Sequence, residues 1–187
     1  MARGSVMSVA PEPAPDWSCE LRLGDLAHGD VELSLVADPD ARARLAGGLG
    51  LDRLDSLTAD IAIAPWLDGA VIEGRWAANI EQTCGVTLEP FATALEGVFT
   101  VRVLPRGSVH AQEEAGGEVI VDPGAEDPPD LIDRDRVDLA AYVVEHLALE
   151  IDPFPRSPGA EFVARPEETP PSPFAVLRQL KPRPEDD

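Results

Sequence analysis

The amino-acid sequence predicts an α+β fold, in which a curved antiparallel β-meander or partial barrel carries one long and one short helix. The main observation is that residues 57–104 hold three runs of alternating apolar and polar residues, a pattern typical of antiparallel strands with one solvated face. Apolar residues also recur at helical spacing over residues 135–151. A helix-capping signal at Asp38 indicates the short helix.

The meander is expected to contain three consecutive strands. Residues 57–66 form the first, the Asp68-Gly69 pair is a hairpin turn, and residues 70–83 return. A bend over residues 85–90 leads to the third strand, residues 91–104. On the predicted core-facing side, the second strand places Ile72, Trp76, Ala78, Ile80 and Gln82, and the third places Phe91, Leu95, Phe99, Val101 and Val103.

Two shorter strands and the short helix are expected before the meander. Alternation over residues 17–23 and an apolar run over residues 31–36 predict the strands. Asp38 is the expected N-cap, and Pro39 suits the first helical position because it has no N–H to leave unpaired. The Gly47-Gly48 pair is expected to end this helix.

After the meander the alternation disappears and acids and prolines accumulate. Residues 105–134 are expected to form an exposed acidic loop in which residues 119–121 are the candidate for an edge strand. The long helix follows over residues 135–151, with Asp133 or Asp135 as its N-cap. Prolines after residue 151 prevent the helix from continuing.

The domain organisation predicted from these patterns is a single folded unit between two tails. Residues 1–15 are expected to be a disordered leader because alternating prolines prevent regular pairing. Residues 16–164 are expected to form one α+β domain, which suits the length of domains in general. Residues 165–187 are expected to be a Pro-rich tail with a short docking segment at residues 174–180.

The charge of the chain is strongly negative. The sequence has 15 Lys and Arg against 35 Asp and Glu, which gives a formal net charge of −20. Nucleic-acid binders use clustered Lys and Arg to neutralise phosphates, whereas this chain has a single lysine, Lys181. Tight direct binding to a duplex is therefore not expected. Opposite charges steer association, so the expected partner is a basic protein.

The sequence contains no recognisable catalytic, cofactor or metal motif. Its two cysteines, Cys19 and Cys84, are not part of a CxxC pair or a His-Cys cluster. Cys84 is interpreted as a small buried hydrophobic residue, and His146 as a solvated surface histidine. With no export signal and no apolar run long enough to span a bilayer, the protein is expected to be cytoplasmic and to bind neither membrane nor DNA.

Four sequence blocks in order resemble the YceD family, the large ribosomal RNA subunit accumulation proteins, in its alphaproteobacterial branch. The blocks cover residues 80–91, 137–149, 153–160 and 173–181. Many family members carry a second cysteine at the bend, where this chain has Thr87. A metal or redox role for a cysteine pair is therefore not expected here. The residues expected to form the family signature or its contacts are Gln82, Cys84, Leu88, Pro90, Phe91, Pro155, Pro158, Gly159, Phe174, Leu177 and Leu180.

The resemblance implies a non-enzymatic accessory role in the accumulation or processing of large-subunit ribosomal RNA and in ribosome assembly. A basic large-subunit ribosomal protein or assembly factor is the expected partner, and any contact with ribosomal RNA is expected to be indirect.

Two other functions fit less well. A direct binder of precursor ribosomal RNA would need a basic groove or exposed aromatic residues; Arg75, Arg102 and Arg106 could form the first, and Trp66 and Trp76 could be the second. A metal-dependent RNA-processing enzyme would need carboxylates clustered on rigid elements, but the acids concentrate in the predicted loop.

Overall fold

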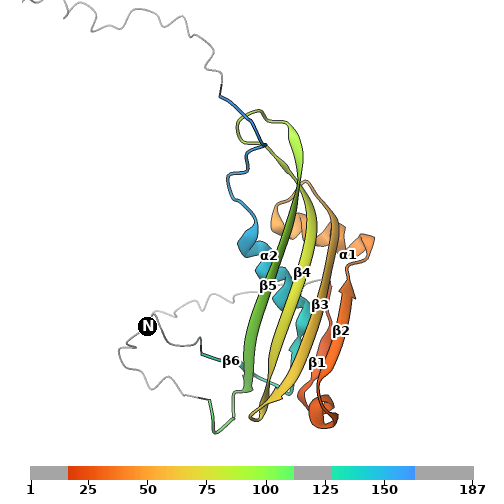
Figure 1. The fold of residues 1–187 in the computed structure, drawn as a ribbon, viewed down its shortest axis with the longest axis vertical. Coiled ribbons are helices and arrows are strands. Elements are labelled where there is room, and N and C mark those ends of the chain that lie inside the picture. The colour runs from red at the N-terminus through yellow and green to blue at the C-terminus, as the bar shows by residue number, and fades with distance from the viewer. Residues whose placement is uncertain (1–16, 112–127, 163–187) are drawn as a thin grey trace, which may run out of the picture.

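The computed structural model describes residues 17–111 and 128–162 of the chain. Its main feature is a sheet of five strands in the order β2-β3-β4-β5-β6. The strands of this sheet are β2 (Val31–Val36), β3 (Arg53–Trp66), β4 (Gly69–Thr83), β5 (Pro90–Pro105) and β6 (Asp130–Ile132). Strands β2 to β5 pair antiparallel with their neighbours, and β6 pairs parallel with β5. The meander is confirmed, and it is a curved open sheet (Figure 1).

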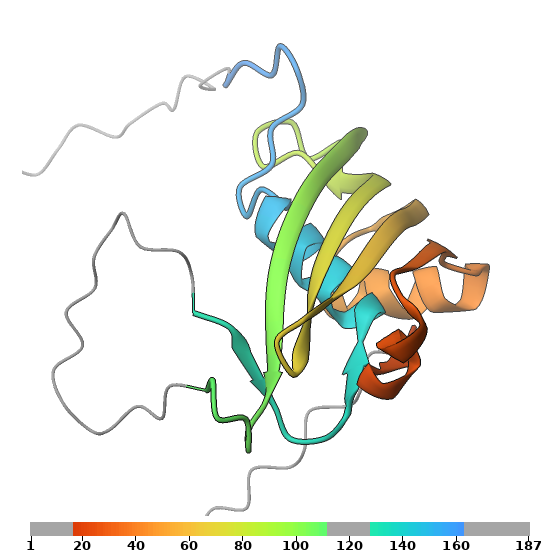
Figure 2. The same ribbon diagram turned by 60° about the horizontal axis from the view of Figure 1, so that its bottom comes forward.

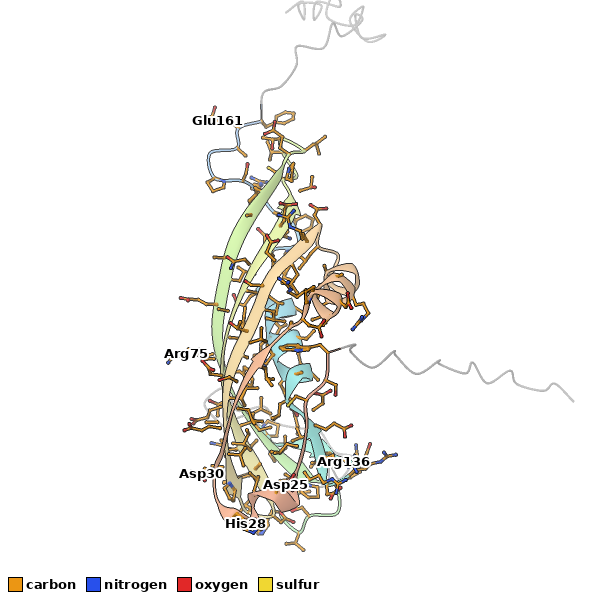
Figure 3. The ribbon with its side chains drawn as sticks, turned by 90° about the vertical axis from the view of Figure 1, so that its right-hand side faces the viewer. Asp25, His28, Asp30, Arg75, Arg136 and Glu161 are labelled. Atoms are coloured by element: carbon orange, nitrogen blue, oxygen red, sulfur yellow. The ribbon has the colours of Figure 1, made fainter. Side chains whose placement is uncertain are left out.

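Helices cover one face of this sheet. The two α-helices are α1 (Pro39–Leu49) and α2 (Leu139–Glu150), and Leu23–His28 forms a short 3-10 helix. Figures 1 and 2 show α1 and α2 on the same side of the sheet. On the opposite side, Arg75 of β4 points away from the helices (Figure 3).

The apolar core lies between this sheet face and the helices. Alternate residues of β4 are buried, including Ile72, Trp76 and Ile80, as the sequence predicted. Along β5, Phe99 and Val103 are buried on the same side, and α2 contributes Val143 and Leu147. Burial of these side chains, at roughly 1.5–3 kcal/mol for each large one, is the main force that holds the helices on the sheet.

The short helix α1 continues beyond the predicted glycine stop. Asp38 caps its start as expected, because its carboxylate accepts a hydrogen bond of 2.8 Å from Ala41 N. Gly47 and Gly48 remain helical and exposed, and the helix ends at Gly50, where φ is +68°. The prediction was wrong because the left-handed conformation, and not the presence of glycine alone, ends a helix.

The first predicted strand, residues 17–23, is also shorter than expected. Only Glu20–Arg22 forms strand β1, and Leu23 starts the 3-10 helix. β1 pairs antiparallel with β7 (Arg136–Asp138), so the two form a separate small sheet. A pattern of alternation did not predict β7, because three residues are too few to show a period.

The long helix begins later than the sequence suggested. Asp138, rather than Asp133 or Asp135, is its N-cap, and the carboxylate accepts hydrogen bonds from Ala140 N at 3.1 Å and Cys19 N at 2.9 Å. The start is delayed because residues 136–138 must stay extended to pair with β1.

The predicted acidic loop contains one strand of the main sheet and lies partly outside the described residues. β6 places Asp130 opposite Val103 and Ile132 opposite Pro105. The predicted edge strand at residues 119–121 falls outside the described residues, as do residues 1–15 and the tail from residue 165.

Candidate contact site at the bend between strands 4 and 5

The candidate site is built on the turn that joins β4 to β5, here called the bend (residues 84–89). Two backbone hydrogen bonds of 2.9 Å close it, from Cys84 N to Glu89 O and from Leu88 N to Cys84 O. Leu88 has a φ of +61°, and its side chain is 76% exposed. A leucine rarely adopts this left-handed conformation, so the turn holds an apolar side chain in solvent at some conformational cost.

The segment that follows α2, here called the strap (residues 151–160), lies across the bend. Gly85 N donates a hydrogen bond of 2.8 Å to Pro155 O. Gln82 Nε2 donates to the carbonyl of Asp152 at 3.1 Å. The strap and the bend are therefore joined by backbone groups and by one of the predicted signature residues.

Cys84 lies at the centre of this junction and is fully buried. Its Sγ accepts hydrogen bonds from three backbone amides, those of Val86 at 3.4 Å, Thr87 at 3.5 Å and Ser157 at 3.3 Å. Hydrogen bonds from Thr87, and then from Ser157, lower the pKa of the Cys84 thiol from 9 to about 6, because they stabilise the thiolate.

The structure supports the interpretation of Cys84 as a structural residue and adds a polar role to it. Its sulfur is an acceptor that joins the bend to the strap, rather than only a small apolar side chain. In the part of the chain that the structure describes, no group of three or more His, Cys, Asp or Glu residues could hold a metal ion.

Exposed apolar side chains surround the junction. Leu88 of the bend and Phe154 of the strap are 76% and 80% exposed, and Phe162 just beyond the strap is 80% exposed. Figure 1 shows the bend and the strap at the same end of the sheet, and Figure 3 places Glu161 at this end as well. Exposed apolar side chains gathered at one end of a molecule are typical of a contact surface.

The structure brings together most of the predicted signature residues. Gln82 and Cys84 contact the strap directly, and Pro90 and Phe91 begin β5 opposite Thr83 and Gln82. In the strap, Pro155 accepts the hydrogen bond from Gly85, and Pro158 and Gly159 follow in a turn closed by Ala160 N and Ser157 O. Phe174, Leu177 and Leu180 lie outside the described residues.

Sequence reasoning missed Gly85, Thr87 and Ser157 as contact residues. Thr87 could have been found, because a residue three positions after a cysteine can direct its amide at the sulfur. Ser157 gave no such signal, since it lies 73 residues from Cys84.

His146 is not the solvated surface residue that was expected. Its ring stacks on that of Phe99 with a centroid distance of 4.4 Å, and its Nδ1 lies 2.8 Å from Tyr142 O. The expectation failed because α2 packs along β5, which brings this face of the helix against the sheet. His28 and His110 are exposed.

Among the described residues, the arginines and tryptophans that could serve a direct RNA binder do not form one exposed group. Trp76 is only 2% exposed and belongs to the core, so it cannot stack on a base. Arg106 pairs with Asp133 at 2.6 Å, and Arg102 lies over the ring of Trp66 at 5.5 Å. Arg75 is on a different part of the sheet face, opposite Val98 in β5.

No helix among the described residues is long and apolar enough to cross a membrane.

Comparison with known proteins places the chain in a family. No curated protein and no solved structure matches it. The family model described as "Large ribosomal RNA subunit accumulation protein YceD" matches residues 72–181, a range that contains the bend, α2 and the strap and covers more than half of the chain. The chain therefore belongs to the YceD family, whose name implies a role in the accumulation of large-subunit ribosomal RNA.

Proposed function

We propose that this protein is a non-enzymatic accessory factor that promotes accumulation or processing of large-subunit ribosomal RNA, acting in the cytoplasm through protein–protein contacts. The observation that supports contact, rather than catalysis, is the junction of the bend and the strap. It combines exposed Leu88, Phe154 and Phe162 with a buried thiol that has no catalytic partner among the residues hydrogen-bonded to it.

The partner we propose is a basic large-subunit ribosomal protein or assembly factor. A net charge of −20 favours encounter with a basic surface and disfavours encounter with RNA. Charge of this kind mainly speeds association, whereas buried apolar contacts provide most of the affinity. Leu88 and Phe154 are the anchors we propose for that purpose.

The test compares two variants of the full chain in cells that lack the natural copy. The first, Leu88→Ser combined with Phe154→Ser, removes the two anchors from the junction. The second, Val36→Ser, is the matched control, because Val36 is also 71% exposed but lies on β2. We expect the double variant to fold normally, to accumulate less mature large-subunit ribosomal RNA, and to lose its protein partner in pull-downs. The control should behave as the wild type.

The salt dependence of the pull-down separates the proposal from direct RNA binding. Proteins that elute as the salt concentration rises would support an acidic adaptor. If RNA stays bound after the proteins have been removed, or if the double variant accumulates normal RNA, the proposal is wrong.

A further inference from the structure

The long strand β5 has an open edge. On one side it pairs with β4 from Pro90 to Val103. On the other side β6 pairs only with Val103, Leu104 and Pro105. From Pro90 to Val101, no described strand pairs with the outer side of β5. Figure 2 shows β5 at the near edge of the sheet, with α2 behind it on the inner face.

Among the described residues, this edge lacks several of the features that usually prevent strand addition. Proteins block exposed edges with short strands, prolines, lysines or β-bulges. Between Phe91 and Val101 the sequence has no proline and no lysine, and the register with β4 is continuous. The opposite edge strand, β2, has only six residues.

An added strand would extend both faces of the sheet beyond β5, so its side chains would lie beside those of β5 on each face. Those of β5 on the outer face are small or neutral except for Glu96 and Arg102, and Val98 is 72% exposed. On the inner face, Phe99 and Val101 face the core. Beside the edge is a hollow that could receive a side chain of an added strand, and its walls are formed by Thr100, Val101, Arg102, Pro128, Asp130 and His146.

The charge around the edge indicates which occupant fits. Glu96 lies on the strand itself, Asp130 lines the hollow, and Glu145 is exposed on α2 next to His146. Arg102, the cation in the hollow, lies over Trp66. A second copy of this chain would bring another −20 charge to the same place, so self-association through this edge is disfavoured.

We propose that the open edge of β5 binds an extended, Lys- or Arg-rich segment of a protein, which adds a strand to the sheet beside β6. Backbone hydrogen bonds of the added strand would satisfy the outward N–H and C=O groups of β5 that no described strand pairs with, and its cations would face Glu96 on the outer face. The choice of a basic protein rests on the proposed function, but the docking mode rests on the geometry of β5 alone.

The test uses a fluorescein-labelled nine-residue peptide of alternating Lys and Val and a second peptide with the same side chains in which every backbone nitrogen is methylated. Fluorescence anisotropy measures binding of both peptides to the full chain. Methylation removes the N–H donors and keeps the charges, so we expect affinity to fall by at least about tenfold. Hydrogen exchange should show new protection, with the first peptide only, of those amides of residues 91–101 that are not bonded to β4.

Two charge-reversal variants locate the site on the sheet. Glu96→Lys on β5 should weaken binding of the unmethylated peptide by about three- to tenfold, whereas Glu32→Lys on β2 should change it less than about twofold. Both glutamates are exposed strand residues of the same sheet, so both variants should fold.

Several outcomes would overturn the proposal. Equal binding of the methylated peptide would mean attraction by charge alone. Protection of β2 instead of β5 would place the site on the wrong edge. Slow exchange of all amides over residues 91–101 in the free protein would mean that the edge is already occupied. None of these measurements depends on Leu88 or Phe154. A negative result in any of them would therefore not contradict the function proposed for the junction of the bend and the strap.

Discussion

The backbone amide of Ser157 donates a hydrogen bond of 3.3 Å to the Sγ of Cys84, although the two residues lie 73 positions apart in the chain. This contact joins the strap to the bend and makes Cys84 the acceptor for both segments. The hydrogen bond from Thr87, and then this one from Ser157, lower the pKa of the thiol, although no basic residue lies near Cys84 in the sequence.

The first prediction concerns the pH dependence of stability. The pKa of the Cys84 thiol is about 6 in the folded protein and 9 in its ordinary state, so folding favours the thiolate. The stabilising contribution is therefore complete above pH 9 and is lost as the pH falls through 6. We expect the difference in urea midpoint between the wild type and Cys84→Ser to grow from pH 6 to pH 9.

Cys19 is the matched control for that experiment. Burial, and then the charge of Asp138, raise the pKa of its thiol, so folding favours the protonated form. The contribution of the Cys19 thiol to stability is present below its ordinary pKa of 9.0 and is lost only as the pH rises above that value. The midpoint difference for Cys19→Ser should not grow between pH 6 and pH 9, and equal behaviour of the two variants would contradict the assignment of the thiolate to Cys84.

The second prediction contrasts two glycines. A Cβ at Gly69 would lie 1.9 Å from the carbonyl oxygen of Val103, which belongs to the backbone and cannot rotate away. We expect Gly69→Ala to lower the free energy of unfolding by roughly 2–3 kcal/mol. Around Gly47 nothing lies within 4 Å, so Gly47→Ala should raise the free energy by about 0.5–1 kcal/mol through helix propensity. Urea unfolding measures both, and a stable Gly69→Ala protein would show that the hairpin is looser than described.

The third prediction compares two N-caps. Asp138→Ala removes the cap of α2 together with the hydrogen bond to Cys19 N, whereas Asp38→Ala removes only the cap of α1. We expect losses in the free energy of unfolding of about 2 kcal/mol and about 1 kcal/mol respectively. Chemical denaturation of both variants checks the ranking. The reverse order would mean that the small β1–β7 sheet contributes nothing to the fold.

The fourth prediction concerns the largest buried side chain, Trp76. Among the described residues its indole N–H has no hydrogen-bond partner, and the ring packs over Gly97. Trp76→Ala should cost roughly 3–5 kcal/mol because it leaves a cavity. Trp76→Phe should lower the free energy of unfolding clearly less, because it removes only part of the ring system and an N–H donor without a partner. Equal losses in urea unfolding would show that the N–H does have a partner.

Much of the fold could be predicted because its signals are local. The alternation over β3, β4 and β5, the Asp68-Gly69 turn and the Asp38 cap each depend on residues that are neighbours in the chain. The bend was predicted as a contact site from the family resemblance, whose residues there lie close together in the chain, between Gln82 and Phe91. Two local signals misled: Gly47 and Gly48 are part of α1, and the alternation over residues 17–23 gives a strand at Glu20–Arg22 alone.

The rest depends on contacts between distant parts of the chain. β6 and β7 have three residues each, too few to show a period, and they are strands only because β5 and β1 offer edges to pair with. The pairing of β7 with β1 keeps Asp138 extended, so α2 starts at Leu139 instead of near residue 135.

The sequence by itself therefore determined the meander, the acidic character and the family signature at the bend, since propensity, charge and short motifs are properties of neighbouring residues. Only the tertiary structure decided that the strap lies on Cys84, that His146 stacks on Phe99, and that β6 is the one described strand on the outer edge of β5. These features arise from packing and from long-range hydrogen bonds, whose partners cannot be assigned until the chain has folded.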